Sequence, residues 1–245
     1  MNILGVRIDN IVLEQAKNKT LEFLNSDKQY KIFTPNPEML VDARKDEYFR
    51  QVLNSGDLNL CDGFGLFLIS NIKRIPGIDF MIEICKIAEK EGMGVYLLGS
   101  GSVEVVKKTV ENLQKQFPKL KIAGYDQGAS YILDKNNHQL IYDPVENNKI
   151  LYKINSFRPD ILFVAFGHNK QEKWIHKNLN KLPSVKIAMG VGGAFDYLSG
   201  FVKRAPCWMR KFGLEWMYRL IKQPTRFKRI FNATVKFLWL ILNNK

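Results

Sequence analysis

The sequence has few of the residues that build disulfide scaffolds and metal centres. The 245-residue chain has three cysteines, Cys61, Cys85 and Cys207. They are too few and too scattered for a disulfide framework or a Cys-x-x-Cys zinc site, and they fit a reducing, cytoplasmic compartment. The three histidines show no metal-ligand spacing, and no Asp-x-Asp pair occurs. We therefore expect no bound metal.

Long hydrophobic runs are also missing. The longest apolar run near the C-terminus is FLWLIL, which falls short of the roughly 20 residues that a membrane-spanning helix needs. The first ten residues, MNILGVRIDN, carry charges where a secretory signal needs an unbroken apolar core. We expect neither a spanning helix nor a signal peptide.

The positive charge is concentrated at one end of the chain. The formal net charge is +13, and residues 203–245 alone hold 11 Lys or Arg against one acidic residue, Glu215. We predict an α/β body over residues 1–202 and a basic amphipathic segment over residues 203–245. A basic field of this size attracts nucleic acid, anionic lipid or phosphorylated substrates.

The body alternates β-rich runs with amphipathic stretches. This pattern predicts βαβ units, and hence a mostly parallel sheet with a Rossmann-like region and helices on both faces. The stretch 125–148 is polar and irregular, which favours a mobile loop. The predicted strands are 30–34, 57–60, 94–99, 119–124, 159–167 and 185–193, and the predicted helices include 37–54, 103–117 and 171–180.

Small or polar residues follow five of these strands. Because the carboxyl ends of parallel strands meet at one edge, we expect a ligand site there. Gly192 and Gly193, after the last strand, are candidate substrate-binding residues. The five loops are Thr34–Asn36, Cys61–Gly63, Gly99–Ser102, Gly167–Gln171 and Gly190–Gly193.

The loop GSGS at 99–102 precedes a predicted helix. Backbone N–H groups of Gly99, Ser100 and Gly101 are candidates for holding a phosphate or the hydroxyls of a nucleotide. Glu104 stands where a dinucleotide fingerprint has its third glycine, which argues against an NAD-dependent oxidoreductase. A tight strand-to-helix turn without a ligand is an equal alternative.

Asp62 is a candidate general base. It stands at a strand end beside two glycines, and a base must reach a substrate hydroxyl and stay ionised near neutral pH. A helix N-cap is the alternative, because Asp is favoured there. Glu172 and Asp196 have the same two interpretations, a place in the site or a capping and solvated position.

The C-terminal segment combines aromatic and aliphatic residues at helical spacing with Lys and Arg between them. Pro224 divides it into two predicted helices. Such helices can lie in the interface of an anionic membrane. The alternative is a pair of helices packed on the body with a solvated basic face.

Six longer segments, in their order and spacing, are similar to one known family. They are TPNPEMLVDARKDEYFRQVLNSGDLNLCDGFGL, RIPGID, VYLLGSG, ILFVAFGHNKQEKWI, GVGGAFDYLSG and RAPCWMRKFGLEWMYRLIKQPTRFKR. With these segments the chain resembles the TagA/CpsF/WecG family, glycosyltransferase family 26. The resemblance runs from LGVRID almost to the C-terminus.

This resemblance implies an inverting, metal-independent glycosyltransferase with no cofactor. The implied reaction moves N-acetylmannosamine or a related sugar from a UDP-sugar donor to the 4-hydroxyl of N-acetylglucosamine on undecaprenyl diphosphate. Such enzymes act in the synthesis of wall teichoic acid or other surface polysaccharides.

The family motifs imply roles for five residues of the body. Asp62 falls on the aspartate of the DG-x-G motif, the proposed base, and Thr34 and Asn36 fall on the neighbouring T-x-N pair. Arg74 belongs to RIPGID, and Gln171 falls on the glutamine of P-K-Q-E.

The C-terminal motif carries Arg204, Arg210 and Arg219, which the resemblance implies meet the diphosphate. The same segment would hold the protein peripherally on the inner face of the cell membrane. Two departures concern the donor sugar: Asn169 replaces the family's proline, and GYDQGAS at 124–130 replaces the more usual Gly-Tyr-Phe.

The composition alone also allows a different class, a basic α/β protein that binds nucleic acid and has no transferase activity. Such a protein would not need five glycine-rich or polar strand ends, so we expect no nucleic-acid partner. The sequence leaves open whether the chain forms a homo-oligomer.

Overall fold

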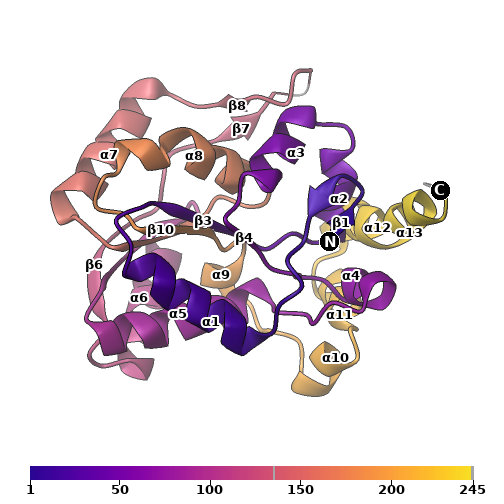
Figure 1. The fold of residues 1–245 in the computed structure, drawn as a ribbon, viewed down its shortest axis with the longest axis horizontal. Helices are drawn as coiled ribbons and strands as arrows, with labels where there is room; N and C mark the ends of the chain where they lie inside the picture. The colour runs from indigo at the N-terminus through magenta and orange to yellow at the C-terminus, as the bar shows by residue number, and fades with distance from the viewer. Residues whose placement is uncertain (135, 244–245) are drawn as a thin grey trace.

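The centre of the molecule is one parallel sheet of six strands in the order β4-β3-β10-β9-β5-β6 (Figure 1). The computed structural model describes residues 1–134 and 136–243. All six predicted strands are present, which confirms the α/β, mostly parallel prediction. They are β3 (Tyr30–Phe33), β4 (Leu58–Asn59), β5 (Gly94–Gly99), β6 (Lys121–Asp126), β9 (Ile161–Ala165) and β10 (Ile187–Gly190).

Helices cover both faces of this sheet, and the build is Rossmann-like (Figure 1). One layer holds α1 (Leu13–Leu24), α5 (Gly77–Glu91), α6 (Val103–Gln116) and α9 (Ala194–Leu198). The other layer holds α2 (Pro37–Ala43), α3 (Glu47–Asn54), α7 (Pro144–Phe157) and α8 (Lys170–Asn178), which a 3₁₀ turn, Leu179–Lys181, extends. A short antiparallel pair, β1 (Asn2–Ile3) and β2 (Val6–Arg7), and helix α4 (Phe64–Ser70) complete the body.

The sequence of β9 explains how one strand serves two cores. All five of its residues are buried. Leu162 and Val164 belong to the core shared with α3, α7 and α8, whereas Ile161 and Phe163 belong to the core shared with α1, α5 and α6. Because side chains alternate along a strand, an uninterrupted apolar run fits a strand that is covered on both faces.

The single helix predicted over 37–54 is wrong, because the structure has two helices there. Asp46 lies at the break between them. It is the N-cap of α3, and its Oδ1 accepts a hydrogen bond from the Phe49 amide at 2.8 Å. The Asp46 side chain is buried and is also paired with Lys173 of α8. An N-cap carboxylate offers the backbone an alternative to helix continuation.

The irregular loop predicted over 125–148 is also wrong. Strand β6 continues to Asp126, β7 (Ile132–Leu133) pairs antiparallel with β8 (Leu140–Ile141), and α7 begins at Pro144. Asp143 caps α7 through the Val145 amide at 2.8 Å. Tyr131 holds the segment against the body. Its side chain is buried, and the centre of its ring lies 4.3 Å from the centre of the Phe166 ring.

The predicted break at Pro224 is confirmed, but the C-terminal segment has more than two helices. Gly213, two residues after the end of α10, has φ +72°, and a Cβ there would clash with the Phe64 ring, so only glycine fits this turn. A π-helical stretch, Asn232–Lys236, separates the last two helices. The segment contains α10 (Cys207–Lys211), α11 (Glu215–Lys222), a 3₁₀ turn (Pro224–Arg226), α12 (Phe227–Phe231) and α13 (Phe237–Leu242).

The C-terminal helices extend from one end of the molecule (Figure 1). They are attached there by Phe237, whose side chain is fully buried in the same core as Leu40 and Leu66. Within residues 1–134 and 136–243, no helix combines the length and the apolar character needed to cross a bilayer.

Candidate active site

A cavity of about 460 Å³ lies at the carboxyl ends of the strands. The five loops predicted to meet at this edge all contribute to its wall, which confirms their convergence. The chain turns from β3 and β4 at one side of the sheet to β5 on the other, and open α/β sheets bind ligands at such a reversal. Predicted residues in the wall are Thr34, Asn36, Asp62, Ser100, Gly101, Gln171, Gly192, Gly193 and Arg219.

Asp62 connects the loop after β4 to the beginning of α5. Its Oδ2 accepts a hydrogen bond from the Gly77 amide at 3.1 Å. The N-cap of the helix that follows Asp62 in sequence is instead Gly63, which makes no side-chain cap. Asp62 therefore binds the N-terminus of another helix, α5, while its carboxylate faces the cavity.

Burial raises the pKa of Asp62 above its ordinary value, against the Gly77 hydrogen bond and the positive charge of Arg74, which lower it. Glu215 raises it further, whereas Arg219 opposes the rise. A carboxylate with a raised pKa is a stronger base than an exposed one, and proton-accepting side chains at reaction centres are often of this kind.

Gly77 leaves the room that Asp62 and Thr34 occupy. A Cβ at this position would lie 3.0 Å from Thr34 Oγ1 and 3.4 Å from Asp62 Oδ2. Asn36, beside them, is the N-cap of α2: its Oδ1 accepts a hydrogen bond from the Met39 amide at 3.1 Å. The T-x-N pair and the Asp62 carboxylate thus lie against the starts of two helices, α2 and α5.

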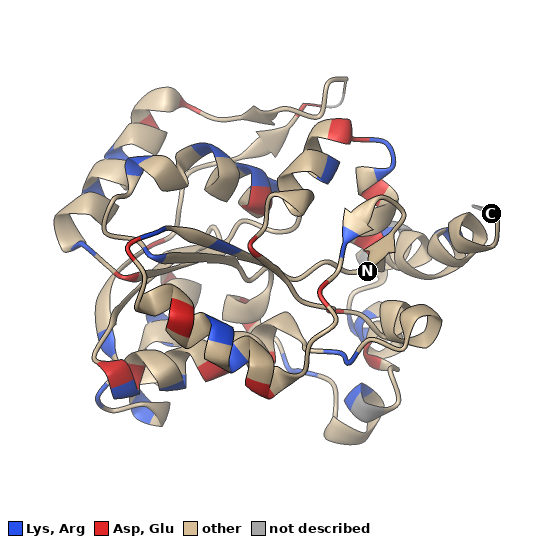
Figure 2. Ribbon diagram, viewed as in Figure 1, with Lys and Arg blue, Asp and Glu red and all other residues tan. Residues whose placement is uncertain are grey.

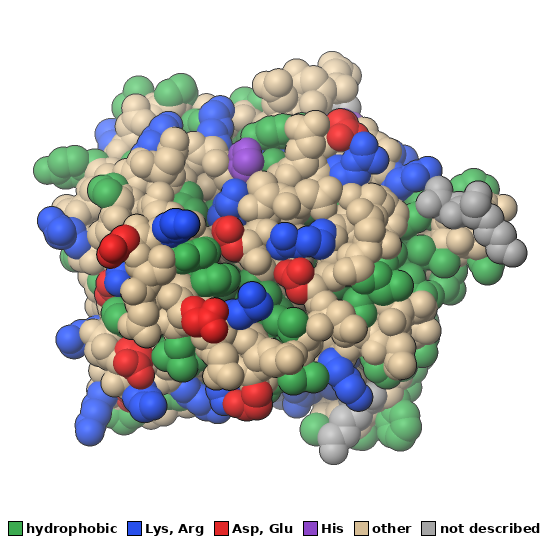
Figure 3. All heavy atoms as spheres, viewed as in Figure 1, with side chains coloured by type: hydrophobic (Ala, Val, Ile, Leu, Met, Phe, Trp, Pro, Cys, Tyr) green, Lys and Arg blue, Asp and Glu red, His purple; other side chains and the backbone are tan. Residues whose placement is uncertain are grey.

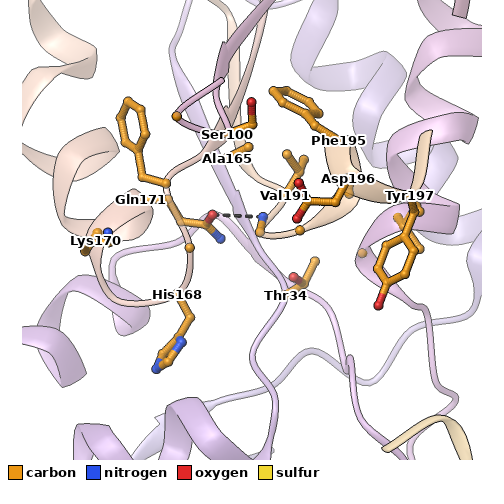
Figure 4. Close-up of a pocket in the computed structure, with 18 of the residues that line it drawn as sticks. Thr34, Ser100, Ala165, His168, Lys170, Gln171, Val191, Phe195, Asp196 and Tyr197 are labelled. Carbon is orange, nitrogen blue, oxygen red and sulfur yellow. Dashed lines mark hydrogen bonds between the residues drawn. The ribbon is translucent and has the colours of Figure 1, made fainter. Parts of the chain in front are cut away.

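Gln171 ties α8 to the loop after β10. Its Oε1 accepts a hydrogen bond from the Gly192 amide at 2.9 Å (Figure 4), and its Nε2 donates to Glu172 Oε1 at 2.7 Å. Both side chains are almost fully buried. Glu172 lies behind the wall, and burial raises its pKa. Gln171 therefore fixes the Gly192 loop, with Glu172 supporting it from inside.

The loop after β5 makes a sharp turn at the cavity wall. Ser100 and Gly101 line the cavity, and both have positive φ, +73° and +68°. Gly99 lies behind them, where a Cβ would clash with the backbone of Ala165. Gly99 is thus required for the close packing of β5 against β9, and of these three residues Ser100 and Gly101 line the cavity. Their amides donate to the carbonyls of Ala165 and Gln127, so they are not free to bind a phosphate.

Three of the four predicted arginines lie beside the cavity without lining it. Arg204 forms a bidentate pair with Asp79 of α5, with Nη2 3.0 Å from Oδ2. Arg74 donates to the Arg210 carbonyl at 3.2 Å and lies 3.5 Å from Glu215. Arg210 itself donates to the Ala205 carbonyl at 3.1 Å.

Arg219 is the predicted arginine that reaches the wall. It donates to Glu215 Oε1 at 2.9 Å, and its guanidinium carbon lies 5.2 Å from the centre of the Tyr197 ring. Asp62 raises the pKa of Arg219, so the two charges attract each other across this end of the cavity.

Several residues of the wall escaped the sequence prediction. His168 and Lys170 lie on one side of the cavity and Tyr197 lies on the other, beside Asp196, for which the sequence had left open a role in the site or in a cap (Figure 4). Arg229 of α12 also lines it. His168 and Lys170 belong to a strand-end loop that was singled out, and Arg229 belongs to the basic segment. The sequence therefore placed these residues in a strand-end loop or in the basic segment. It could not single them out, because many other charged residues lie in the same two places.

Metal ligands do not gather in the part of the chain that the structure describes: no group of three or more His, Cys, Asp or Glu residues there could hold an ion. The charged groups at the cavity are instead mixed in sign. The body helices also carry both acidic and basic residues (Figure 2).

Residues 1–245 match the model of the "Glycosyl transferase WecG/TagA/CpsF family". The chain belongs to this glycosyltransferase family. The resemblance found in the sequence motifs is thereby confirmed.

Three relatives show how close this family member is to named enzymes. Each carries the name N-acetylglucosaminyldiphosphoundecaprenol N-acetyl-beta-D-mannosaminyltransferase. The protein of Bacillus spizizenii is 33% identical over 97% of this chain and 88% of its own length. The Bacillus subtilis protein is 36% identical over 87% and 80%, and that of Staphylococcus aureus 32% identical over 100% and 93%.

Proposed function

We propose that this glycosyltransferase moves N-acetylmannosamine, or a closely related sugar, from a UDP-sugar to the 4-hydroxyl of N-acetylglucosamine on undecaprenyl diphosphate. The observation that carries the proposal is Asp62, a carboxylate of raised pKa in the wall of the strand-end cavity. The shared name of the three relatives supports the acceptor and the sugar. The product would enter teichoic acid or another surface polysaccharide.

In the proposed mechanism, Asp62 takes the proton of the acceptor hydroxyl while that oxygen attacks the anomeric carbon. Its Oδ2 is held by the Gly77 amide, so the carboxylate is oriented before the acceptor arrives. UDP leaves from the opposite face of the sugar, and the configuration inverts. A positioned base of this kind contributes typically 10²–10⁴-fold to the rate.

The leaving diphosphate needs positive charge and N–H donors. Arg219 and Lys170 lie in the same cavity wall, whereas the amides of Ser100 and Gly101 already donate to the carbonyls of Ala165 and Gln127. A planar guanidinium can form two parallel hydrogen bonds to a phosphate, which favours arginine for this role. We propose that Arg219 and Lys170 replace a metal ion, and that Arg74, Arg204 and Arg210 support them from behind the wall.

The acceptor is bound to a lipid, so the protein must approach a membrane. The C-terminal helices expose several large apolar side chains, and Figure 3 shows hydrophobic side chains gathered at this end of the molecule. We propose that this end lies on the anionic inner face of the cell membrane, where basic residues of the segment contact headgroups. The exposed residues are Phe227, Phe231, Val235, Leu238, Trp239 and Leu242.

The decisive experiment is a donor screen with several UDP-sugars and a short-chain GlcNAc-diphosphate-lipid acceptor, with UDP release as the signal. We expect release with UDP-N-acetylmannosamine or a related donor, and an inverted anomeric configuration of the product by NMR. Release should persist in excess EDTA. If no UDP-sugar gives acceptor-dependent release, the proposed reaction is wrong; dependence on added Mg²⁺ would contradict the metal-free mechanism alone.

A further inference from the structure

One cluster at the cavity rim joins the body to the C-terminal segment and is not used by the proposed mechanism. It contains His168 from the loop before α8, Glu38 and Asp42 from α2, and Arg229 from α12. Arg229 Nε donates to Glu38 Oε1 at 2.8 Å, and its Nη2 donates to Glu38 Oε2 at 3.1 Å. This bidentate contact docks α12 against α2.

The His168 ring lies between Asp42 and Arg229. Its Nε2 is 2.9 Å from Asp42 Oδ2, and its Nδ1 is 3.1 Å from Arg229 Nη2. A guanidinium has only donors, so Nδ1 must accept from Arg229 with its lone pair. The proton of the neutral ring is then on Nε2, where the Asp42 carboxylate accepts it. The docked geometry therefore selects one tautomer of the neutral imidazole.

Protonation of His168 would place a second N–H on the side of Arg229. Two donors and two positive charges would then face each other, and the Arg229–imidazole hydrogen bond would be lost. The contact between Arg229 and Glu38 would remain, so docking would weaken rather than disappear.

We propose that His168, held by Asp42, is a positioning residue for Arg229 and makes the docking of α12 at the cavity rim dependent on pH. Neutral His168 favours the docked segment, and protonated His168 favours release. The device would regulate when the C-terminal segment closes the cavity. Its effect on turnover rests on the proposed function, whereas the docking itself does not.

The charges around His168 decide where the change occurs. Burial lowers the pKa of His168, but the Asp42 hydrogen bond and the negative charge of Glu38 outweigh it and raise the pKa above its ordinary value. Arg229 lowers it. Glu172, on α8, faces the ring from inside the body. The net rise moves the transition from acidic pH toward neutral pH.

Thermodynamic linkage fixes the sign of the effect. Because docked Arg229 lowers the His168 pKa, undocking must raise it, and proton binding must in turn favour undocking. Docking is therefore strongest above the His168 pKa and is lost as the pH falls through it. The ratio of the docking constants at the two pH extremes equals ten raised to the difference between the undocked and docked His168 pKa values.

The first test measures the His168 pKa by NMR titration of the imidazole in the full chain. Arg229→Gln removes the docked positive charge, so we expect the pKa to rise. Asp42→Asn removes the carboxylate that stabilises the imidazolium, so we expect it to fall. His176 is the matched control: it is on α8 and bonded to Ser55 Oγ at 3.0 Å, away from the cavity wall. An unchanged His168 pKa in Arg229→Gln would overturn the proposal.

The second test follows docking directly, by hydrogen exchange of the amides of residues 225–237 between pH 5.5 and 8.5, corrected for the intrinsic pH dependence of exchange. We expect protection to increase with pH in the wild-type protein and in His176→Gln. In His168→Gln the side-chain amide can still bridge Asp42 and Arg229 but cannot titrate, so protection should not vary with pH. The same pH-dependent increase in His168→Gln would refute the role of His168.

A kinetic test separates this inference from the proposed function. With an active enzyme, we expect the pH dependence of KM for the diphosphate-bearing substrates to flatten in His168→Gln. Failure of transfer in every protein would contradict the proposed function only, because the NMR and exchange results stand without it. A flattened kcat profile with an unchanged KM profile would contradict the positioning role.

Discussion

At the residue scale, the chemistry depends on how one carboxylate is held. Asp62 is joined to α5 by a single backbone hydrogen bond and is surrounded by Arg74, Arg219 and Glu215. Among the described residues, its Oδ1 has no hydrogen-bond partner in the structure, so that oxygen is available to an acceptor hydroxyl. This arrangement leads to two predictions.

Replacing Asp62 by Asn should leave the fold and UDP binding intact but reduce turnover by roughly 10²-fold or more, the range expected for a positioned base. The amide keeps an oxygen for the Gly77 amide but cannot take a proton. The measurement is UDP release under saturating substrates, with circular dichroism and UDP binding as controls. Turnover near the wild-type level would return Asp62 to a purely structural role at the start of α5.

The acid limb of the kcat/KM profile should report the Asp62 pKa, and two neighbours should move it in opposite directions. Activity needs the ionised carboxylate, so it rises as the pH passes the Asp62 pKa. Arg74→Gln removes a charge that lowers this pKa, so the limb should shift to higher pH. Glu215→Gln removes a charge that raises it, so the limb should shift to lower pH. Shifts of equal sign would show that the limb belongs to another group.

At the scale of elements, the cavity is held in shape by contacts between loops that are distant in sequence. The Gln171 side chain of α8 connects to the Gly192 amide after β10, and the Gly77 amide of α5 connects to Asp62 after β4. These two hydrogen bonds therefore hold helix starts against strand ends.

Gln171→Met should lower stability by about 1–3 kcal/mol, because the half-buried Gly192 amide loses its acceptor and buried Glu172 loses its donor while the volume is nearly kept. Thermal and urea denaturation should detect the loss. Gln114→Met, on the exposed face of α6, is the matched control and should change little. Equal stability of the two variants would mean that water satisfies the Gly192 amide.

At the scale of the whole molecule, the C-terminal segment has two surfaces with different tasks. Phe237 is fully buried against the body, whereas its neighbours Leu238 and Trp239 are exposed to 46% and 60%. The first surface attaches the segment, and the second is open to a membrane. Adjacent residues thus allow attachment and adhesion to be separated by point variants.

The double variant Leu238→Ser, Trp239→Ser should weaken binding to anionic liposomes without lowering the melting temperature. Phe237→Ala should instead cost about 3–5 kcal/mol of stability, as for other buried aromatic side chains. Vesicle co-sedimentation at low and high salt is the measurement, and Tyr152→Ser on α7, exposed to 78%, is the control. Undiminished sedimentation of the double variant would contradict the proposed membrane surface.

The sequence predicted more of the sheet than of the helices. Apolar runs such as ILFVA identify strands buried on both faces, because both sides of the run must be covered. The periodicity over 37–54 did not show the break at Asp46, because the break depends on a capping carboxylate and on Lys173, more than 100 residues away. The hairpin over 132–141 was missed for a similar reason, because Tyr131 packs on a distant Phe166.

The sequence by itself determined the family, the parallel sheet and the five loops at one edge, since these follow from local patterns and from parallel strand geometry. Only the tertiary structure decided which contacts each residue makes at the carboxyl edge of the sheet. Among the predicted arginines, Arg219 lines the wall while Arg204 is held by Asp79, and His168 and Arg229 meet although 61 residues separate them. Such pairings depend on which charges folding brings within hydrogen-bond distance, and a linear pattern does not contain that distance.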